Sequence, residues 1–294
     1  MRYVLTLIAN PCARDLDDSM IEAAQGALAA PDGITWLAPR IACDLAFTSD
    51  PLAAEAAVRE RLDGAAVDIV IQPEAGRRKT LLVADMESTV IANEFINELA
   101  ELAGVGERVA AITERAIAGE IDFAEALGER VAMLAGLSET ALDQVYENLT
   151  VLPGARALIA TMAAHGAHAA LVSGGFTFFT ERVRTLLGFH SHSANTLEVT
   201  AHHLSGELIP PIIDRVGKRK RLDELCGELG IARHQAMAVG DGANDIDMLE
   251  AAGMGVAFHA IPAAAAAANV RIDHGDLTAL LYFQGYHDRD IRDI

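Results

Sequence analysis

The sequence contains few aromatic residues, few cysteines and few basic residues for its length. Aromatic side chains make up 5% of the 294 residues, whereas 51% of the residues are hydrophobic. This apolar content excludes an intrinsically disordered chain and is typical of a helix-rich globular protein with a sizeable core. At about 150 residues per domain, the length indicates two domains or one large one.

The three cysteines, Cys12, Cys43 and Cys226, are widely spaced and odd in number. No CxxC pair or Cys/His cluster at ligand spacing accompanies them, so we predict neither a disulfide framework nor a zinc site, and we expect a reducing cytoplasm. A long stretch without charged residues, Ala157–Thr180, contains two histidines and a Ser-Gly-Gly turn. We therefore expect a helix, a turn and a strand there rather than a membrane span.

The charge balance is strongly acidic, with 42 acidic and 23 basic residues and a formal net charge of −19. Such a chain repels nucleic acids and anionic membrane surfaces, so we predict neither as a partner. It also repels an anionic substrate at long range. A site for such a substrate therefore requires local positive charge.

Residues 1–73 alternate strand-like and helix-like segments. The strands are expected at 2–9, 34–37, 44–48 and 67–72, and the helices at 19–29 and 52–62. This strand–helix–strand–strand–helix–strand order predicts a ferredoxin-like module, with Trp36 in its core. No residue fixes a ligand, so a structural role or a homodimer contact remains open for this domain.

A polar segment, residues 73–79, leads into a second domain, which we place at 74–294. Apolar strands at 80–84, 167–172, 235–239 and 255–258 alternate there with helical patterns. This alternation predicts an α/β fold with a doubly wound parallel sheet. The helical insertion at about 94–150 is expected to form a cap over the carboxyl edge of the sheet.

Polar residues follow these strands, at the edge where open parallel sheets bind ligands. Asp85 ends the first strand and Glu87 comes two residues later. A carboxylate in this position can attack phosphorus, and a second acid can protonate a leaving alcohol. Ser173 and Gly174 follow the next strand and offer a hydroxyl and backbone N–H groups to phosphate oxygens.

Two further segments suit phosphate chemistry. Asp241, Asn244 and Asp245 surround a glycine turn and supply the oxygen ligands that Mg²⁺ prefers, so we predict magnesium here. The basic run at 217–221 contains Lys218 and Lys220, and either ammonium could neutralise a phosphoryl group. Composition alone does not choose between the two lysines.

In this order and spacing, DMEST at 85–89, SGGF at 173–176, Lys218 and GDGAND at 240–245 resemble the four motifs of the haloacid dehalogenase superfamily. The resemblance runs from about residue 81 to 281 and is closest to the phosphoserine phosphatase branch. It implies a nucleophile, Asp85, and a general acid/base, Glu87. It also implies Mg²⁺ bound by Asp85, the backbone carbonyl of Glu87 and Asp241, with support from Asp245. The implied phosphate contacts are Ser173, Gly174, Lys218 and Asn244. The first domain resembles the ACT-type domains that precede some members of this branch.

Two cap residues extend the resemblance. Glu94 matches the residue that binds the substrate ammonium, and Arg130 matches the one that binds the substrate carboxylate. Together with Lys218 and Mg²⁺ they are complementary to the three charged groups of phosphoserine. The resemblance implies hydrolysis of phosphoserine to L-serine and phosphate through an aspartyl-phosphate, the last step of serine biosynthesis.

Glu87 departs from the family pattern, which usually has Asp at this position. The longer side chain moves the carboxyl group by about one C–C bond, and a misplacement of about 1 Å can lower a rate about 10²-fold. Two alternatives use the same residues: phosphoryl transfer from phosphoserine to another hydroxyl amino acid, and a non-catalytic serine-binding regulator. Competition by an acceptor would reveal the first, and serine binding without phosphate release would reveal the second.

Overall fold

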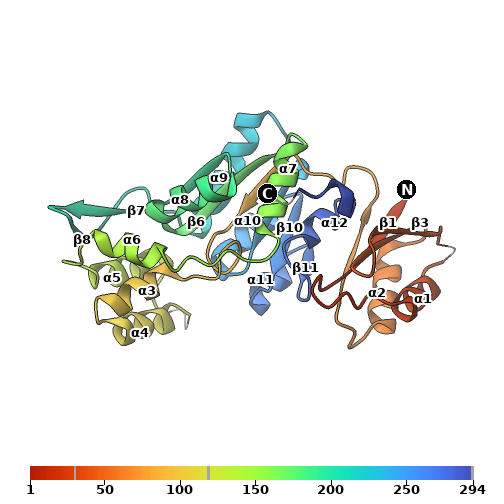
Figure 1. The fold of residues 1–294 in the computed structure, drawn as a ribbon, viewed down its shortest axis with the longest axis horizontal. Helices are drawn as coiled ribbons and strands as arrows, with labels where there is room; N and C mark the ends of the chain where they lie inside the picture. The colour runs from red at the N-terminus through yellow and green to blue at the C-terminus, as the bar shows by residue number, and fades with distance from the viewer. Residues whose placement is uncertain (30, 118–119, 293–294) are drawn as a thin grey trace.

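The chain folds around two β-sheets, seen in the computed structural model of Figure 1. The structure describes residues 1–29, 31–117 and 120–292. In Figure 1 the smaller sheet lies at one end of the molecule, the helices of the insertion lie at the other, and the larger sheet lies between them. Within the described residues, no helix combines the length and the apolar character needed to cross a bilayer.

The smaller sheet is antiparallel, with the strand order β2-β3-β1-β4. Its elements are β1 (Tyr3–Ala9), α1 (Asp18–Ala27), β2 (Ile34–Ala38), β3 (Ala42–Phe47), α2 (Pro51–Arg61) and β4 (Val67–Pro73). The predicted ferredoxin-like order is confirmed. Asp17 and Asp50 begin the two helices by accepting hydrogen bonds from backbone N–H groups of the first turn. The prediction for Trp36 was wrong, because this side chain is 37% exposed on the edge strand β2.

The larger sheet has the strand order β11-β10-β9-β5-β6-β7-β8 and is parallel except for β8. Its strands are β5 (Leu81–Ala84), β6 (His168–Phe176), β7 (Ser191–Thr200), β8 (His203–Ile209), β9 (Ala236–Gly240), β10 (Met254–Phe258) and β11 (Val270–Ile272). Its helices are α7 (Ala155–Ala164), α8 (Thr177–Leu187), α9 (Arg215–Leu229), α10 (Ile246–Ala251), α11 (Pro262–Ala267) and α12 (Ala279–Tyr282), with 3₁₀ turns at Arg233–Gln235, Ala243–Asp245 and Asp288–Asp290. The predicted doubly wound α/β fold is confirmed.

The central strand β5 is buried on both of its faces. Leu82 and Ala84 join the hydrophobic cluster on one side of the sheet, whereas Leu81 and Val83 join the cluster that includes residues of α9 and α10. A strand covered on both sides reads as a continuous apolar run, which explains why it was easy to predict. It also fixes the position of the residue that follows, Asp85.

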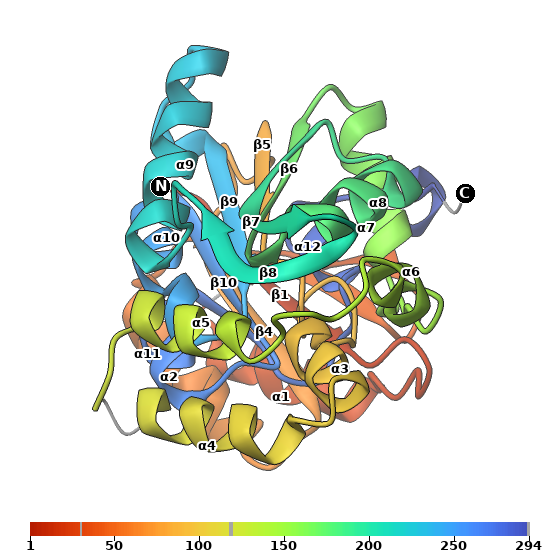
Figure 2. The same cartoon turned by 90° about the vertical axis from the view of Figure 1, so that its left-hand side faces the viewer.

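The insertion between β5 and α7 forms four helices within the described residues, and these face the viewer in Figure 2. They are α3 (Phe95–Leu102), α4 (Gly106–Ile117), α5 (Phe123–Ala132) and α6 (Thr140–Tyr146). The chain leaves and re-enters the core side by side, because Ala92 N–H donates to Thr150 O and Leu152 N–H donates to Val90 O, both at 2.9 Å. The hairpin of β7 and β8 reaches out from the core and packs on α5.

The two sheets are in direct contact through buried residues. Ile8 and Val70 of the smaller sheet belong to the same hydrophobic cluster as Leu82 of the larger one. Asp68 on β4 accepts hydrogen bonds from the backbone N–H groups of residues 273–275, at 2.7 to 3.3 Å. The smaller sheet is therefore packed onto the larger one by both apolar and polar contacts.

Candidate active site

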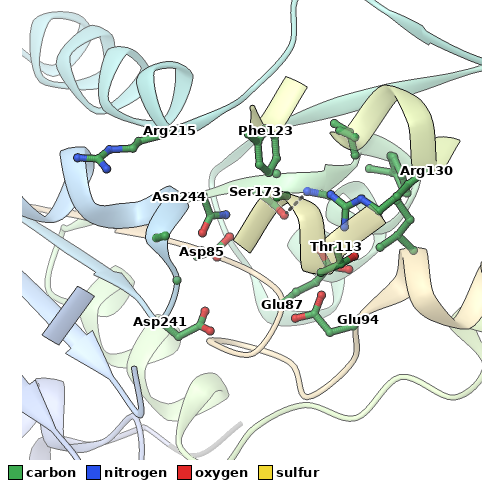
Figure 3. A pocket seen from close by; sticks show the side chains of 18 residues that line it. Asp85, Glu87, Glu94, Thr113, Phe123, Arg130, Ser173, Arg215, Asp241 and Asn244 are labelled. Carbon is green, nitrogen blue, oxygen red and sulfur yellow. Dashed lines mark hydrogen bonds between the residues drawn. The ribbon is translucent and has the colours of Figure 1, made fainter. Parts of the chain in front are cut away.

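The register of the sheet brings three of the predicted segments to one place. Ala84 at the end of β5 pairs with Leu171 on β6 and Val239 on β9, so the residues that follow these three positions lie level with one another. Strand order reverses at β5, and ligands of open α/β sheets bind at such a point. A cavity of about 550 Å³ lies there (Figure 3). Its lining includes the predicted site residues Asp85, Glu87, Glu94, Arg130, Ser173, Gly174, Asp241 and Asn244.

Below this cavity the buried ammonium of Lys218 lies between two carboxylates. Its Nζ is 2.7 Å from Oδ1 of Asp85 and 2.7 Å from Oδ1 of Asp245, and the Lys218 side chain is fully buried. Burial opposes the charged form, but the two carboxylates raise the pKa of Lys218 above its ordinary value. Lys220, in contrast, is 75% exposed. The structure therefore places Lys218, and not Lys220, beside Asp85, a distinction that composition alone could not make.

Asp85 has one oxygen engaged and one available. Its Oδ1 accepts a hydrogen bond from the backbone N–H of Met86, at 2.8 Å, and forms a salt bridge with Lys218. Its Oδ2 has no hydrogen-bond partner among the residues that the structure describes. Burial and the nearby Asp245 carboxylate raise the pKa of Asp85, whereas Lys218 lowers it. A buried carboxylate with a free oxygen at the cavity floor can act as a nucleophile.

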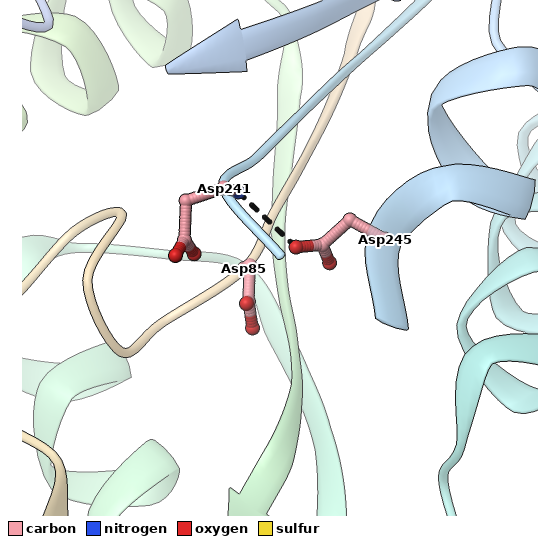
Figure 4. A group of neighbouring side chains, drawn as sticks. All are labelled: Asp85, Asp241 and Asp245. Atoms are coloured by element: carbon pink, nitrogen blue, oxygen red, sulfur yellow. Dashed lines mark hydrogen bonds between the residues drawn. The ribbon is translucent and has the colours of Figure 1, made fainter. Parts of the chain in front are cut away.

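The nucleophile is one of three carboxylates that lie close together, as Figure 4 shows. One oxygen each from Asp85, Asp241 and Asp245 lie within 4.8 Å of one another. Burial and the Asp245 carboxylate raise the pKa of Asp241 to about 6. Since Lys218 supplies a single positive charge, the cluster keeps a surplus of negative charge. A divalent cation would neutralise that surplus, and the oxygen ligands suit a hard cation.

Glu87 links the core to the first helix of the insertion. Its Oε1 accepts a hydrogen bond from the backbone N–H of Phe95, at 2.8 Å, where α3 begins. Burial and the Glu94 carboxylate raise the pKa of Glu87 to about 8. An acid with a pKa in this range holds its proton at neutral pH and can donate it. Glu94 itself accepts a hydrogen bond from the hydroxyl of Ser88, at 2.8 Å.

Arg130 faces the cavity from α5 (Figure 3). Its Nε donates to the carbonyl of Ala126 at 3.2 Å, and the side chain is half-buried. Burial lowers the pKa of Arg130, whereas Glu87 and Glu94 raise it. Within the described part of the chain, Arg130 forms no salt bridge, so its guanidinium is available to an anion.

The Ser-Gly-Gly segment is part of β6 rather than the loop after it. The strand continues to Phe176, and its pairing with β7 shifts between Val172 and Phe176, so the predicted strand end at 172 was wrong. The hydroxyl oxygen of Ser173 accepts the N–H of Gly175, at 2.9 Å. This N–H is therefore engaged within the protein. Asn244 lines the same cavity from the turn after β9.

Several cavity residues were not among the predicted site residues. They are Ile96, Thr113, Ala116, Phe123, Leu127, Gly175, Phe176, Arg215, Gly242 and Ala243. Phe123 and Leu127 precede Arg130 by seven and three positions, so all three share one face of α5. Helical spacing from Arg130 could have found them. Arg215 likewise precedes Lys218 by three positions on α9, although it pairs with Asp247.

Comparison with known proteins agrees with this geometry. Residues 82–250 match the haloacid dehalogenase-like hydrolase family. The chain belongs to this family. Individual members of this family align with most of the chain, as three examples show.

Phosphoserine phosphatase SerB2 of Mycobacterium tuberculosis is 44% identical over 229 residues, which are 78% of this chain and 55% of that protein. Phosphoserine phosphatase of Polaromonas sp. is 46% identical over 207 residues, which are 68% of this chain and 88% of that protein. A solved structure of a probable phosphoserine phosphatase from Vibrio cholerae superposes with a TM-score of 0.79 at 30% identity, covering 98% of this chain and 88% of that one. The chain thus spans about half the length of the Mycobacterium relative and most of the other two.

Proposed function

We propose that this hydrolase is a magnesium-dependent phosphoserine phosphatase that works through Asp85. The observation that carries the proposal is the distribution of charge in the cavity. Arg130 and Glu94 line its cap side, while Asp85 lies on its floor with Lys218 beneath. A substrate with a carboxylate, an ammonium and a phosphate matches this arrangement. The names of the relatives support the same substrate.

We propose Mg²⁺ as the cation of the carboxylate cluster. Asp85 and Asp241 would hold it through their side chains and Glu87 through its backbone carbonyl, with support from Asp245. The residues suit a divalent cation because three carboxylates lie within 4.8 Å of one another and only one buried ammonium, that of Lys218, contacts them in the described structure. When bound, the cation would offset negative charge on the nucleophile and on the phosphate.

The proposed reaction has two steps, which the chain's own side chains carry out. In the first, Asp85 Oδ2 attacks phosphorus, the bond from phosphorus to the serine oxygen breaks, and Glu87 donates its proton to that oxygen. In the second, Glu87 takes a proton from water, whose oxygen attacks phosphorus and releases Asp85 and inorganic phosphate. The raised pKa of Glu87 supports the protonated starting state.

The substrate is held by groups that do not react. Arg130 would bind the carboxylate as a bidentate partner, and Glu94 would bind the ammonium. Ser173, Gly174 and Asn244 would contact phosphate oxygens, and Lys218 would offset charge on the phosphoryl group through Asp85. Because the whole chain is strongly acidic, these local cations are what make an anionic substrate acceptable.

The experiment is inorganic phosphate release from L-phosphoserine with Mg²⁺. We expect turnover in the unsubstituted protein, none with Asp85→Asn, and a raised KM with little change in kcat for Arg130→Gln. Gln at position 130 keeps much of the length and removes the charge, and Arg108→Gln on α4 serves as a matched control for loss of an exposed arginine. Absence of phosphate release from phosphoserine, with serine still bound, would instead favour a non-catalytic regulator. Phosphorylation of an added hydroxyl amino acid would favour transfer.

Four further predictions remain proposals. We place the boundary between the domains at residue 73, with the cap at about 94–150, and this division is supported by the positions of the two sheets and of α3–α6. A homodimer through the first domain and the ACT-type character of that domain rest on the sequence. So does the cytoplasmic location, which the three free cysteines support.

A further inference from the structure

The carboxyl group of Glu87 lies in a confined space between the core and the cap. On one side its Oε1 accepts the N–H of Phe95, at 2.8 Å, at the start of α3. On the other side the backbone of Gly175 approaches it. A Cβ atom on Gly175 would lie 2.6 Å from Oε2 of Glu87 and 3.2 Å from its Cδ. The acid is thus held between a cap donor and a core glycine.

Glycine is not required at position 175 by its own backbone. The φ angle of Gly175 is not in the positive region that favours glycine, so an L-residue can adopt its conformation without strain. What opposes a side chain most is the space that Glu87 occupies, and the hydroxyl oxygen of Ser173 lies 3.2 Å from the same Cβ position. The preceding residue, Gly174, differs, because a Cβ there would meet the Phe123 ring at 3.0 Å rather than Glu87.

We infer that Gly175 is a positioning residue, which makes room for the longer acid of this chain and fixes where its carboxyl group lies. The inference rests on the proposed role of Glu87 as the acid and base. An ordinary contact begins at about 3.4 Å, so a Cβ at position 175 would displace Oε2 by about 0.8 Å. A displacement near 1 Å can cost about 10²-fold in rate.

Aspartate at position 87 relieves this conflict. The substitution Glu87→Asp shortens the side chain by one C–C bond, about 1.5 Å, and withdraws the carboxyl group from Gly175. The cost of a methyl group at position 175 therefore depends on the length of the acid. If the methyl group only disturbed the end of β6, its cost would be the same with Glu or Asp at position 87.

The test compares Gly175→Ala, Glu87→Asp and the double variant on two substrates. Phosphoserine needs a proton on its leaving oxygen, whereas p-nitrophenyl phosphate releases a stable anion without one. We expect Gly175→Ala to lower phosphoserine turnover by about 10- to 100-fold. Release of p-nitrophenolate in the first turnover should stay within about 3-fold. In the Glu87→Asp background, the cost of Gly175→Ala should also fall to within about 3-fold.

Gly227→Ala on α9 is the matched control, because a Cβ there meets no atom within 4 Å. Equal losses on both substrates, or an unchanged cost in the Glu87→Asp background, would overturn the inference. If the unsubstituted protein releases no phosphate from phosphoserine, the proposed function fails separately. Amide exchange then decides: Gly175→Ala should speed exchange of the Phe95 N–H only when Glu87 is present, and unchanged exchange would refute the positioning role.

Discussion

Lys218 and Lys220 lie two residues apart on α9 but have very different surroundings. Lys218 is fully buried, with its Nζ 2.7 Å from a carboxylate oxygen of Asp85 and of Asp245. Lys220 is 75% exposed and lies 3.8 Å from Glu224, one helical turn away. The same substitution at the two positions therefore separates the energetics of a buried cation from those of a surface cation.

Replacing Lys218 by Met keeps an unbranched side chain but removes the charge. At an effective dielectric constant of about 20, each 2.7 Å contact is worth about 6 kcal/mol before the cost of burying the charges. That burial cost offsets much of the attraction, and losing one partner of a buried pair costs about 3–5 kcal/mol. We expect a loss of this size in the free energy of unfolding for Lys218→Met, and less than about 1 kcal/mol for Lys220→Met.

The assay is urea unfolding at neutral pH in the presence of a chelator, so that no cation replaces the ammonium. Lowering the pH should return part of the lost stability, because burial raises the pKa of Asp85 and its protonated carboxyl group needs no cationic partner. A loss below about 1 kcal/mol for Lys218→Met, or equal losses for both lysines, would refute the reasoning.

Two other predictions concern the carboxylates. Mg²⁺ at about 100 times its Kd should stabilise the protein by about 2.7 kcal/mol in thermal melts. The substitution Asp241→Asn should remove most of this stabilisation, since Asp241 belongs to the carboxylate cluster. A stabilisation that survives the substitution would contradict the site. Asp68→Ala should lower the free energy of unfolding by about 2–4 kcal/mol, because three backbone N–H groups at 273–275 lose their acceptor. The exposed Asp63→Ala should change it by less than about 0.5 kcal/mol, and equal effects would argue against the contact.

Sequence patterns predicted the two sheets because buried strands are recognisable without knowledge of their neighbours. β5 is apolar on both faces and ends at Asp85, so its pattern identified both the strand and the nucleophile position. Trp36 shows the limit of this reasoning. A strand at the edge of a sheet and one at its centre have similar apolar patterns. The exposure of Trp36 becomes clear only from the sheet itself, in which β2 is an edge strand next to β3.

At the site, local patterns predicted residue types but not contacts between distant segments. The basic run did not distinguish Lys218 from Lys220, since the choice depends on which face of α9 points toward Asp85. The proximity of Gly175 to Glu87 joins β6 to the loop after β5, and neither segment alone reveals it. Such contacts arise from the packing of strands that are far apart in the sequence.

The shared interior of the two sheets has a consequence for recombination between relatives. Ile8 and Val70 pack into the same cluster as Leu82, and Asp68 binds the turn at 273–275. A chimera joined at residue 73, with the first domain of one protein and the second of another, would bring two unmatched surfaces together. Exchange of the first domain therefore requires exchange of the turn and the apolar residues that it covers, as one unit.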